Sequence, residues 1–367
     1  MSSPPVRLTV SAKSDRGKTR DHNEDTFLVA DLTHGTTDFL DGGRAVVGQR
    51  GSLFLVADGM GGAAAGEVAS AMAADVIFRH VTETWGRSAE SSGDEFIARL
   101  REAVELANRQ LHLYARQHPD VRGMGTTATV VGVFGARLYL AQVGDSRAYL
   151  VRRGEAVQLT KDQSLMQRLI DAGELTEAEA EQSERRNIIL QALGPDARIR
   201  VDVTYQDLSR GDILILCSDG LSGQVKREEI ASLVSQTSEV DHISDTLVQL
   251  ANERGGPDNI TVVVVRFDGE GLPEVNSGSA MGYQVYPLPE AGEPASEPEP
   301  EPDLEPEPEV QPDPEPAAAP PPPDTAVEAS APVATPARRS GSPAAMAALV
   351  VLVLLLLFLL FRILVQS

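Results

Sequence analysis

The sequence predicts an α+β fold built on antiparallel sheets for residues 1–269, and three observations support this. Strand-like apolar runs are numerous in this region. Several of them follow one another across short turns, such as the one at Gly135, which favours antiparallel pairing over repeated β-α-β units. Long helical patterns accompany the strands, so helices should cover the sheets.

The elements are expected in a definite order along the chain. Strands are expected at 6–11, 26–30 and 51–57, and long helices follow at 64–83 and 95–117. Three more strands, at 126–134, 137–143 and 147–151, precede a short helix at 164–171. The last elements are strands at 200–205 and 212–217, helices at 226–235 and 241–254, and a strand at 260–267. Residues 1–269 form a region long enough to bury a sizeable core.

The acidic charge of the chain lies mostly outside this region. Of the net charge of -22, residues 270–343 contribute -13, and 19 of the 24 prolines lie at or after position 270. Residues 1–269 show no basic run, so we expect no nucleic-acid partner. The single cysteine, Cys217, excludes an intrachain disulfide and a cysteine-based zinc cluster. With no signal-peptide core at the N-terminus, residues 1–269 are expected in a reducing cytosol.

Two segments of different character are expected after the folded region. Residues 269–343 are Pro/Glu-rich and predict a disordered linker. Residues 344–361 are apolar without interruption, and at ~1.5 Å per residue such a helix nearly spans the ~30 Å core of a bilayer. We therefore expect a transmembrane helix at 344–364, since no surrounding domain would bury it. Two arginines precede it and one follows, so the positive-inside rule predicts a single-pass cell-membrane protein with a cytoplasmic catalytic domain.

Carboxylates recur where apolar runs end. LFLVADG ends with Asp58, ILILCSDG ends with Asp219, and Asp145 follows a third apolar run. Two further stretches, NED (23–25) and GPDN (256–259), precede strands. An Asp-Gly pair is most often a hairpin turn, yet a helical pattern rather than a return strand follows Asp58. Clustered carboxylates are costly unless a cation holds them, and Mg²⁺ and Mn²⁺ prefer oxygen ligands, so the pattern indicates a divalent metal site.

The polar motifs stand in a fixed order that is far more specific than any one of them. The blocks are RDHNED (20–25), DGMGG (58–62), GTTA (125–128), GDSRAY (144–149), TKD (160–162), ALG (192–194), SDG (218–220) and GPDNIT (256–261). Their order and spacing resemble the metal-dependent Ser/Thr protein phosphatases of the PPM (type 2C) family in their bacterial form. The resemblance covers roughly residues 6–267.

The resemblance implies a four-layer αββα sandwich of two antiparallel sheets, with a phosphatase domain at 6–268 and a binuclear metal centre at one end. The implied metal ligands are Glu24, Asp25, Asp58, the carbonyl group of Gly59, Asp145, Asp219 and Asp258. Asp58 would bridge the two metals, with Gly59 on one of them. Asp219 and Asp258 would hold one metal, and Glu24 would reach the other directly or through water, with Asp25 either as a neighbouring ligand or as a carboxylate just outside the ligands.

The resemblance also implies a reaction and its cofactors. Asp145 would hold a weaker third metal, and Arg20 matches the family's phosphate-gripping arginine, so Arg20 and Asp58 are the implied catalytic residues. Two Mn²⁺ or Mg²⁺ ions would share a water, lower its pKa and aim the resulting bridging hydroxide at the phosphorus of phosphoserine or phosphothreonine. The planar fork of Arg20 can hold two phosphate oxygens. The implied partners are phosphorylated proteins, including membrane Ser/Thr kinases.

Two positions depart from the wider family. Many members carry a His two residues after the bridging Asp, where this chain has Met60, so the acid that protonates the leaving group is not identified; a metal-bound water is the expected substitute. The family's Asp-His-Ser after the TKD block is here Asp162-Gln163-Ser164. The charged stretch 165–194 resembles the flap beside the active site of bacterial members.

Other functions fit the sequence less well. A cysteine phosphatase needs an Arg six residues after its thiolate, and Gly223 stands there after Cys217. No GxxxxGK[ST] phosphate loop occurs, which excludes a P-loop NTPase. A catalytically silent phosphatase-fold signalling or binding module stays open, although such a protein would usually have lost metal carboxylates that this chain retains. So does a phosphatase acting on a small phosphorylated metabolite or an anti-sigma-type regulator.

Overall fold

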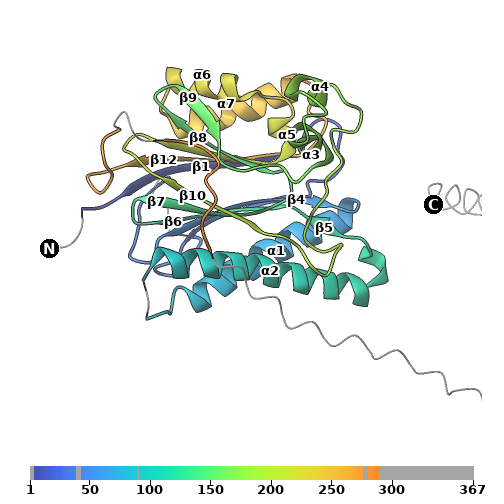
Figure 1. Ribbon diagram of the computed structural model, residues 1–367, viewed down its shortest axis with the longest axis horizontal. Coiled ribbons are helices and arrows are strands. Elements are labelled where there is room, and N and C mark those ends of the chain that lie inside the picture. The colour runs from blue at the N-terminus through green and yellow to red at the C-terminus, as the bar shows by residue number, and fades with distance from the viewer. Residues whose placement is uncertain (1–3, 39–42, 90, 276–279, 289–367) are drawn as a thin grey trace, which may run out of the picture. The chain divides into compact units, whose positions relative to one another are not determined.

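The structure is a computed structural model that describes residues 4–38, 43–89, 91–275 and 280–288 (Figure 1). Most of the predicted linker and the whole predicted transmembrane helix at 344–364 lie outside these residues. Within the described part of the chain, no helix is both long and apolar enough to cross a bilayer.

The strands form two six-membered groups of antiparallel pairs, which we call sheet A and sheet B. Sheet A has the order β3 (Arg44–Val46), β1 (Arg7–Asp15), β12 (Ile260–Asp268), β11 (Ile213–Cys217), β8 (Arg147–Arg152) and β9 (Glu155–Gln158). Sheet B has the order β10 (Asp202–Asp207), β7 (Arg137–Val143), β6 (Ala128–Phe134), β4 (Ser52–Met60) and β2 (Asp25–Asp31), and the short β5 (Gly125–Thr126) pairs with the end of β4. The predicted antiparallel α+β fold is confirmed.

Helices cover the outer face of each sheet (Figure 1). Sheet B is covered by α1 (Ala63–Thr84) and α2 (Gly93–Gln117), which are followed by the 3-10 turn η1 (Pro119–Val121). Sheet A is covered by α5 (Asp219–Ser222), α6 (Arg227–Gln236) and α7 (Val240–Glu253). The stretch expected to be a flap contains α3 (Leu165–Asp171) and α4 (Glu177–Glu181). The layers therefore follow the order helix, sheet, sheet, helix.

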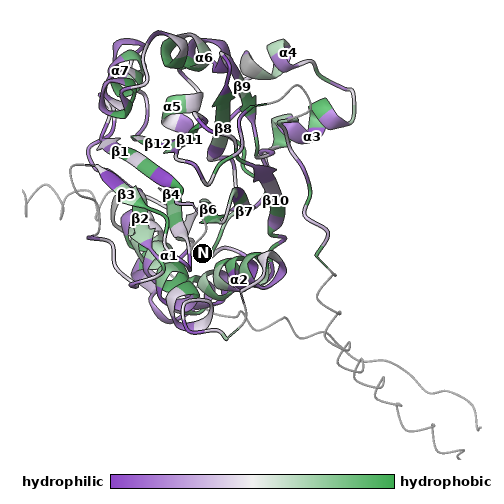
Figure 2. Ribbon diagram, turned by 90° about the vertical axis from the view of Figure 1, so that its left-hand side faces the viewer, coloured by the Kyte–Doolittle hydropathy of each residue, from purple (hydrophilic) through white to green (hydrophobic). Residues whose placement is uncertain are grey.

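The central strands are apolar on both faces because each face meets a different layer. In β4, Phe54 and Val56 pack between the sheets, while Leu53 and Leu55 pack against the helical layer of sheet B. Strands β11 and β12 show the same division. Side chains of a strand alternate between its faces, so continuous apolar runs such as LFLVA are what a strand buried on both sides requires. In Figure 2, hydrophobic and hydrophilic residues interchange along α7, whose apolar side covers sheet A.

The packed region extends past the predicted boundary at residue 268. Leu272 is buried between the sheets at 3% exposure. Residues 280–288 then lie along the free edge of β10, where Val285 pairs antiparallel with Thr204. The Tyr286 amide donates to the Val203 carbonyl at 3.0 Å. We call residues 280–288 the edge segment; they continue the fold of sheet B.

Candidate metal centre

Strands β2 and β4 place two of the predicted ligands side by side. Asp25 is the first residue of β2 and Asp58 lies near the end of β4, and the two are direct partners in the antiparallel register. Directly opposed residues hold their Cβ atoms about 5 Å apart. The register of sheet B therefore brings both carboxyl groups to one end of the sandwich.

Two further carboxylates reach the same end from sheet A. Asp219 is the first residue of α5, directly after β11, and Asp258 lies just before β12. The hydroxyl of Ser218 donates to Asp25 Oδ2 at 2.7 Å and accepts from the amide of Thr261 at 3.0 Å. This hydroxyl ties the strand ends of sheet A to those of sheet B, and Figure 1 shows α5 and β5 at the same end.

The glycine after each aspartate permits a close backbone approach. A Cβ atom on Gly59 would lie 2.3 Å from the carbonyl oxygen of Gly66, and one on Gly220 would lie 2.0 Å from that of Asn259. Gly59 is inside β4 and Gly220 is inside α5, so neither Asp-Gly pair forms a hairpin turn. The turn interpretation of these pairs is therefore wrong.

Glu24 and Asp145 complete the carboxylates at this end. The backbone amide of Glu24 donates to Asn259 Oδ1 at 2.8 Å. The Glu24 carboxylate packs against the first turn of α1, where a Cβ atom on Gly66 would lie 1.8 Å from Glu24 Oε2. Asp145 follows β7 and is 7% exposed. Gly144 before it has a φ of 105°, a backbone conformation that favours glycine.

The carboxylates repel one another and resist ionisation. Burial, followed by the charges of Asp25 and Asp219, raises the pKa of Asp58 well above its ordinary value. Burial raises the pKa of Asp25 to about 7, and burial together with Asp219 raises that of Asp145 to about 8. The pKa of Asp219 is raised by burial and then by Asp258. The charge of Asp219 contributes to the raised pKa of Asp25, Asp58 and Asp145 alike, so these four carboxylates form one electrostatic cluster.

The cluster fits a metal ion because its donors are carboxylate oxygens and because some of these oxygens lack a hydrogen-bond partner. One buried oxygen on each of Asp25, Asp145 and Asp219 has no hydrogen-bond partner. Unpartnered buried carboxylate oxygens are costly, and they are the ligands that Mg²⁺ and Mn²⁺ prefer. Among the described residues, however, no three His, Cys, Asp or Glu side chains converge closely enough to hold an ion as they stand. The carboxylate oxygens are thus the right type of ligand for Mg²⁺ or Mn²⁺. That they meet around one ion stays a prediction.

Arg20 lies at the exposed rim of the cluster. Its Nη2 donates to Asp258 Oδ2 at 2.7 Å, and half of its side chain is exposed. The predicted phosphate-binding residue is therefore next to a predicted metal ligand, as the resemblance implied. Its pairing with one of those ligands was not expected from the sequence.

Two polar residues that hold the ligands in place, Asn259 and Thr127, were not predicted from the sequence. Asn259 donates to the carbonyl oxygens of Arg16 and His22, at 2.9 and 2.8 Å, and so fixes the loop that carries Arg20. Thr127 Oγ1 accepts from the Asp58 amide at 2.9 Å. Both residues stand inside the quoted motifs, so buried polar residues beside the ligands were the available signal.

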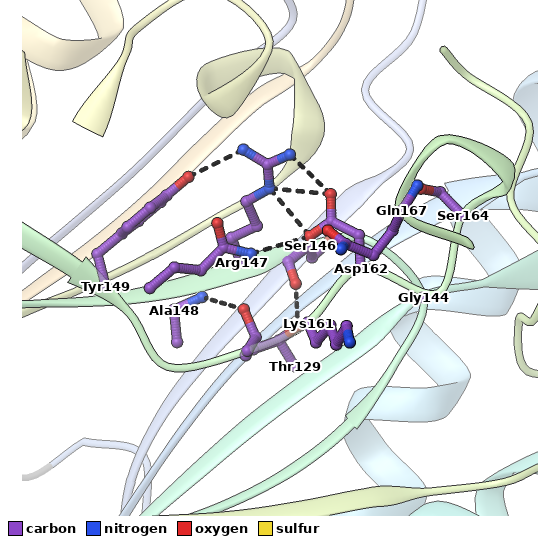
Figure 3. Close-up of polar contacts among 12 residues, drawn as sticks. Thr129, Gly144, Ser146, Arg147, Ala148, Tyr149, Lys161, Asp162, Ser164 and Gln167 are labelled. Carbon is purple, nitrogen blue, oxygen red and sulfur yellow. Dashed lines mark hydrogen bonds and ion pairs between the residues drawn. The ribbon is translucent and has the colours of Figure 1, made fainter. Parts of the chain in front are cut away.

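A partly buried ion pair supports the loop that carries Asp145 (Figure 3). Arg147 Nε lies 3.0 Å from both carboxylate oxygens of Asp162, and its Nη2 lies 2.7 Å from Oδ2. The guanidinium also reaches the hydroxyl of Tyr149 at 3.1 Å. Ser146 accepts from Thr129 through its carbonyl oxygen at 2.8 Å. These contacts fix the strand end on which Asp145 sits.

Comparisons with known proteins agree with this site. The family model for protein phosphatase 2C matches residues 37–260. The serine/threonine phosphatase stp of Listeria welshimeri is 35% identical over 254 residues, which are 69% of this chain and 93% of that protein. The serine/threonine protein phosphatase PstP of Mycobacterium tuberculosis is 38% identical over 278 residues, which are 75% of this chain and 48% of that protein.

Solved structures share the fold. The crystal structure of the Mycobacterium tuberculosis phosphatase PstP/Ppp has 36% identity and a TM-score of 0.59, over 71% of this chain and 99% of that one. A structure of the PstP catalytic domain with two manganese ions has 36% identity and a TM-score of 0.58, over 72% and 99% of the two chains. The predicted family is thus confirmed: the chain belongs to the protein phosphatase 2C family and is a phosphatase.

Proposed function

We propose that the chain hydrolyses phosphoserine and phosphothreonine in proteins at the carboxylate cluster described above. The observation that carries this proposal is that both sheets bring carboxylates to one end of the sandwich, namely Asp25, Asp58, Asp145 and Asp219, and that one buried oxygen on each of Asp25, Asp145 and Asp219 has no hydrogen-bond partner. Curated relatives that match most of this chain are named serine/threonine phosphatases, which supports the same substrate class.

The cofactors we propose are two Mn²⁺ or Mg²⁺ ions, with a third at Asp145. A solved relative contains two manganese ions, which supports manganese. The residues that would hold the ions are those predicted above: Glu24, Asp25, Asp58, the carbonyl group of Gly59, Asp219 and Asp258. Divalent ions supply positive charge that withdraws electrons from a phosphoryl group and acidifies water.

The chain's own residues then bind and orient the phosphate. Arg20 stands at the rim, and its planar guanidinium can hold two phosphate oxygens once Asp258 has another partner. Asp58 is oriented from its backbone by Thr127, and Asp25 is oriented by the Ser218 hydroxyl. Met60 at the end of β4 has no proton to give, so the leaving group takes its proton from another source.

The activity has a direct test in the full-length protein. A phosphothreonine peptide should be hydrolysed with Mn²⁺ and not with EDTA, and a phosphotyrosine peptide should be a poor substrate. Asp58→Asn should abolish turnover while the protein stays folded by circular dichroism, and Asp171→Asn, at an exposed position on α3, serves as the matched control. Absence of turnover with metal would support the silent signalling module instead.

We further propose that the protein is held at the cytoplasmic face of the cell membrane by residues 344–364, and that membrane Ser/Thr kinases are among its substrates. The uninterrupted apolar run at 344–361 supports the anchor. A tether raises the local concentration of the enzyme near membrane-borne phosphoproteins. Membrane fractionation before and after deletion of residues 344–367 tests this, and a full-length protein found in the supernatant would refute the anchor.

A further inference from the structure

The side chain of Gln163 lies between the loop that carries Asp145 and the far end of the segment 165–200. It is 7% exposed. Its Oε1 accepts from the Gly144 amide at 3.0 Å, and its Nε2 donates to the Arg200 carbonyl at 3.2 Å. Arg200 lies two residues before β10, so one amide group bonds the residue before Asp145 and the end of the segment.

The backbone of Gln163 repeats this connection. Its amide donates to the Gly144 carbonyl at 2.9 Å, and its carbonyl accepts from the Leu190 amide at 2.8 Å. The next residue, Ser164, pairs with Ile189 and caps α3 by accepting from the Gln167 amide at 3.2 Å. The two ends of the segment therefore meet at Gln163 and Ser164.

The neighbours of Gln163 leave it little freedom to move. Asp162 is held on β8 by Arg147, whose guanidinium lies between Asp162 and Tyr149 in Figure 3. On the other side, a Cβ on Gly144 would lie 2.6 Å from the side chain of Thr127, so this loop is also closely packed. The contacts of Gln163 with Gly144 and Arg200 therefore lie between closely packed neighbours.

We propose that Gln163 is a positioning residue that couples the segment 165–200 to the orientation of Asp145. The inference rests on the proposed function, because it takes Asp145 as a metal ligand. A primary amide suits this place because it offers both an acceptor and a donor, as the two contacts require. It also brings no charge to a cluster of carboxylates that already repel one another.

Three variants separate the two contacts. Gln163→Leu removes both side-chain hydrogen bonds and keeps the two backbone ones, while Gln163→Glu keeps a side-chain acceptor for the Gly144 amide and loses the donor to the Arg200 carbonyl. Gln167→Leu is the matched control, since Gln167 lies on α3 of the same segment and its side-chain amide, among the residues that the structure describes, donates to Asp171 and not to Gly144 or Arg200.

Hydrogen exchange of the full-length protein in EDTA tests the connection without metal. In Gln163→Leu we expect exchange at least tenfold faster at Gly144 and in residues 186–200. In Gln163→Glu the acceleration should be confined to residues 186–200, and Gln167→Leu should match the wild type at both places. Unchanged exchange in Gln163→Leu would overturn the inference. Should that variant not fold, protection of residues 186–200 in Gln163→Glu equal to the wild type would overturn it.

A Mn²⁺ titration, followed by calorimetry and by turnover, tests the consequence for the site. Gln163→Leu should raise the Mn²⁺ concentration needed for half-maximal turnover and lower kcat/KM for a phosphothreonine peptide more than for p-nitrophenyl phosphate. A purely structural defect would lower kcat/KM equally for both substrates, and that result would overturn the proposed coupling. A wild type without metal-dependent turnover, combined with the expected exchange pattern, would refute the proposed function and leave the connection itself standing.

Discussion

Replacement of Asp145 by Asn should stabilise the metal-free protein at neutral and alkaline pH. Burial and the charge of Asp219 raise the pKa of Asp145 from 3.8 to about 8. At a pH below the pKa of Asp145 in the unfolded chain, the carboxyl group is protonated in both the folded and the unfolded state, so it does not lower the free energy of unfolding. As the pH rises above it, the unfolded chain ionises first, so the free energy of unfolding falls until the folded pKa is passed.

The size of this effect follows from the shift. One pKa unit corresponds to about 1.4 kcal/mol, so Asp145 should cost the metal-free protein about 4 kcal/mol at pH 7 relative to pH 4. Asn is nearly isosteric and cannot ionise, so the variant should escape this cost. Added Mn²⁺ should reverse the order, because a metal that binds the folded state stabilises the wild type more.

Urea unfolding in EDTA at pH 5, 6, 7 and 8 measures the difference. The advantage of Asp145→Asn should grow with pH and shrink towards pH 5. Asp171→Asn is the control with the opposite sign, since a hydrogen bond from Lys161 lowers the pKa of the exposed Asp171. The reasoning fails if Asp145→Asn is no more stable than the wild type at pH 8, or if its advantage does not depend on pH.

Three other substitutions test contacts that hold the fold together, and the third of them lies beside the site. Tyr286→Phe removes the hydrogen bond to Asp94, 2.5 Å long, and should lower the free energy of unfolding by about 1 kcal/mol without changing turnover. Arg152→Met leaves the fully buried Asp212 without its ion-pair partner, although the Ser209 amide still donates to it, and should cost about 3–5 kcal/mol in urea unfolding. Gly220→Ala places a methyl group 2.0 Å from a carbonyl oxygen ahead of β12, so calorimetry should show a lower Tm and Mn²⁺ binding should weaken.

The positions of the strands in the sequence were easier to predict than the pairing of the strands in the sheets. The apolar runs of β4 and β11 are continuous because both faces are buried, and that pattern is visible in the sequence. Strands β3 and β9 have three and four residues, too few to show a period of two. The register that sets Asp25 opposite Asp58 is a property of the assembled sheet and left no local signal.

The ligand residues were predictable for a similar reason, and their contacts were not. A carboxylate at the end of a buried strand is locally unfavourable, so Asp58 and Asp219 stood out in the sequence. The ion pair between Arg20 and Asp258 joins residues 238 positions apart and depends on the fold as a whole. Gln163 was noticed as a departure from the family motif, but its two bonding partners come from distant parts of the chain.

The edge segment has a consequence for the solubility of the domain. Strand β10 ends sheet B, and its outward amide and carbonyl groups would otherwise be a template for a strand from another molecule. The edge segment occupies that template from within the chain, through the pairing of Val285 with Thr204. A protein truncated after residue 268 would expose this edge of β10. Its self-association, compared with that of a protein that keeps residues 280–288, would measure how far the edge segment keeps neighbouring molecules apart.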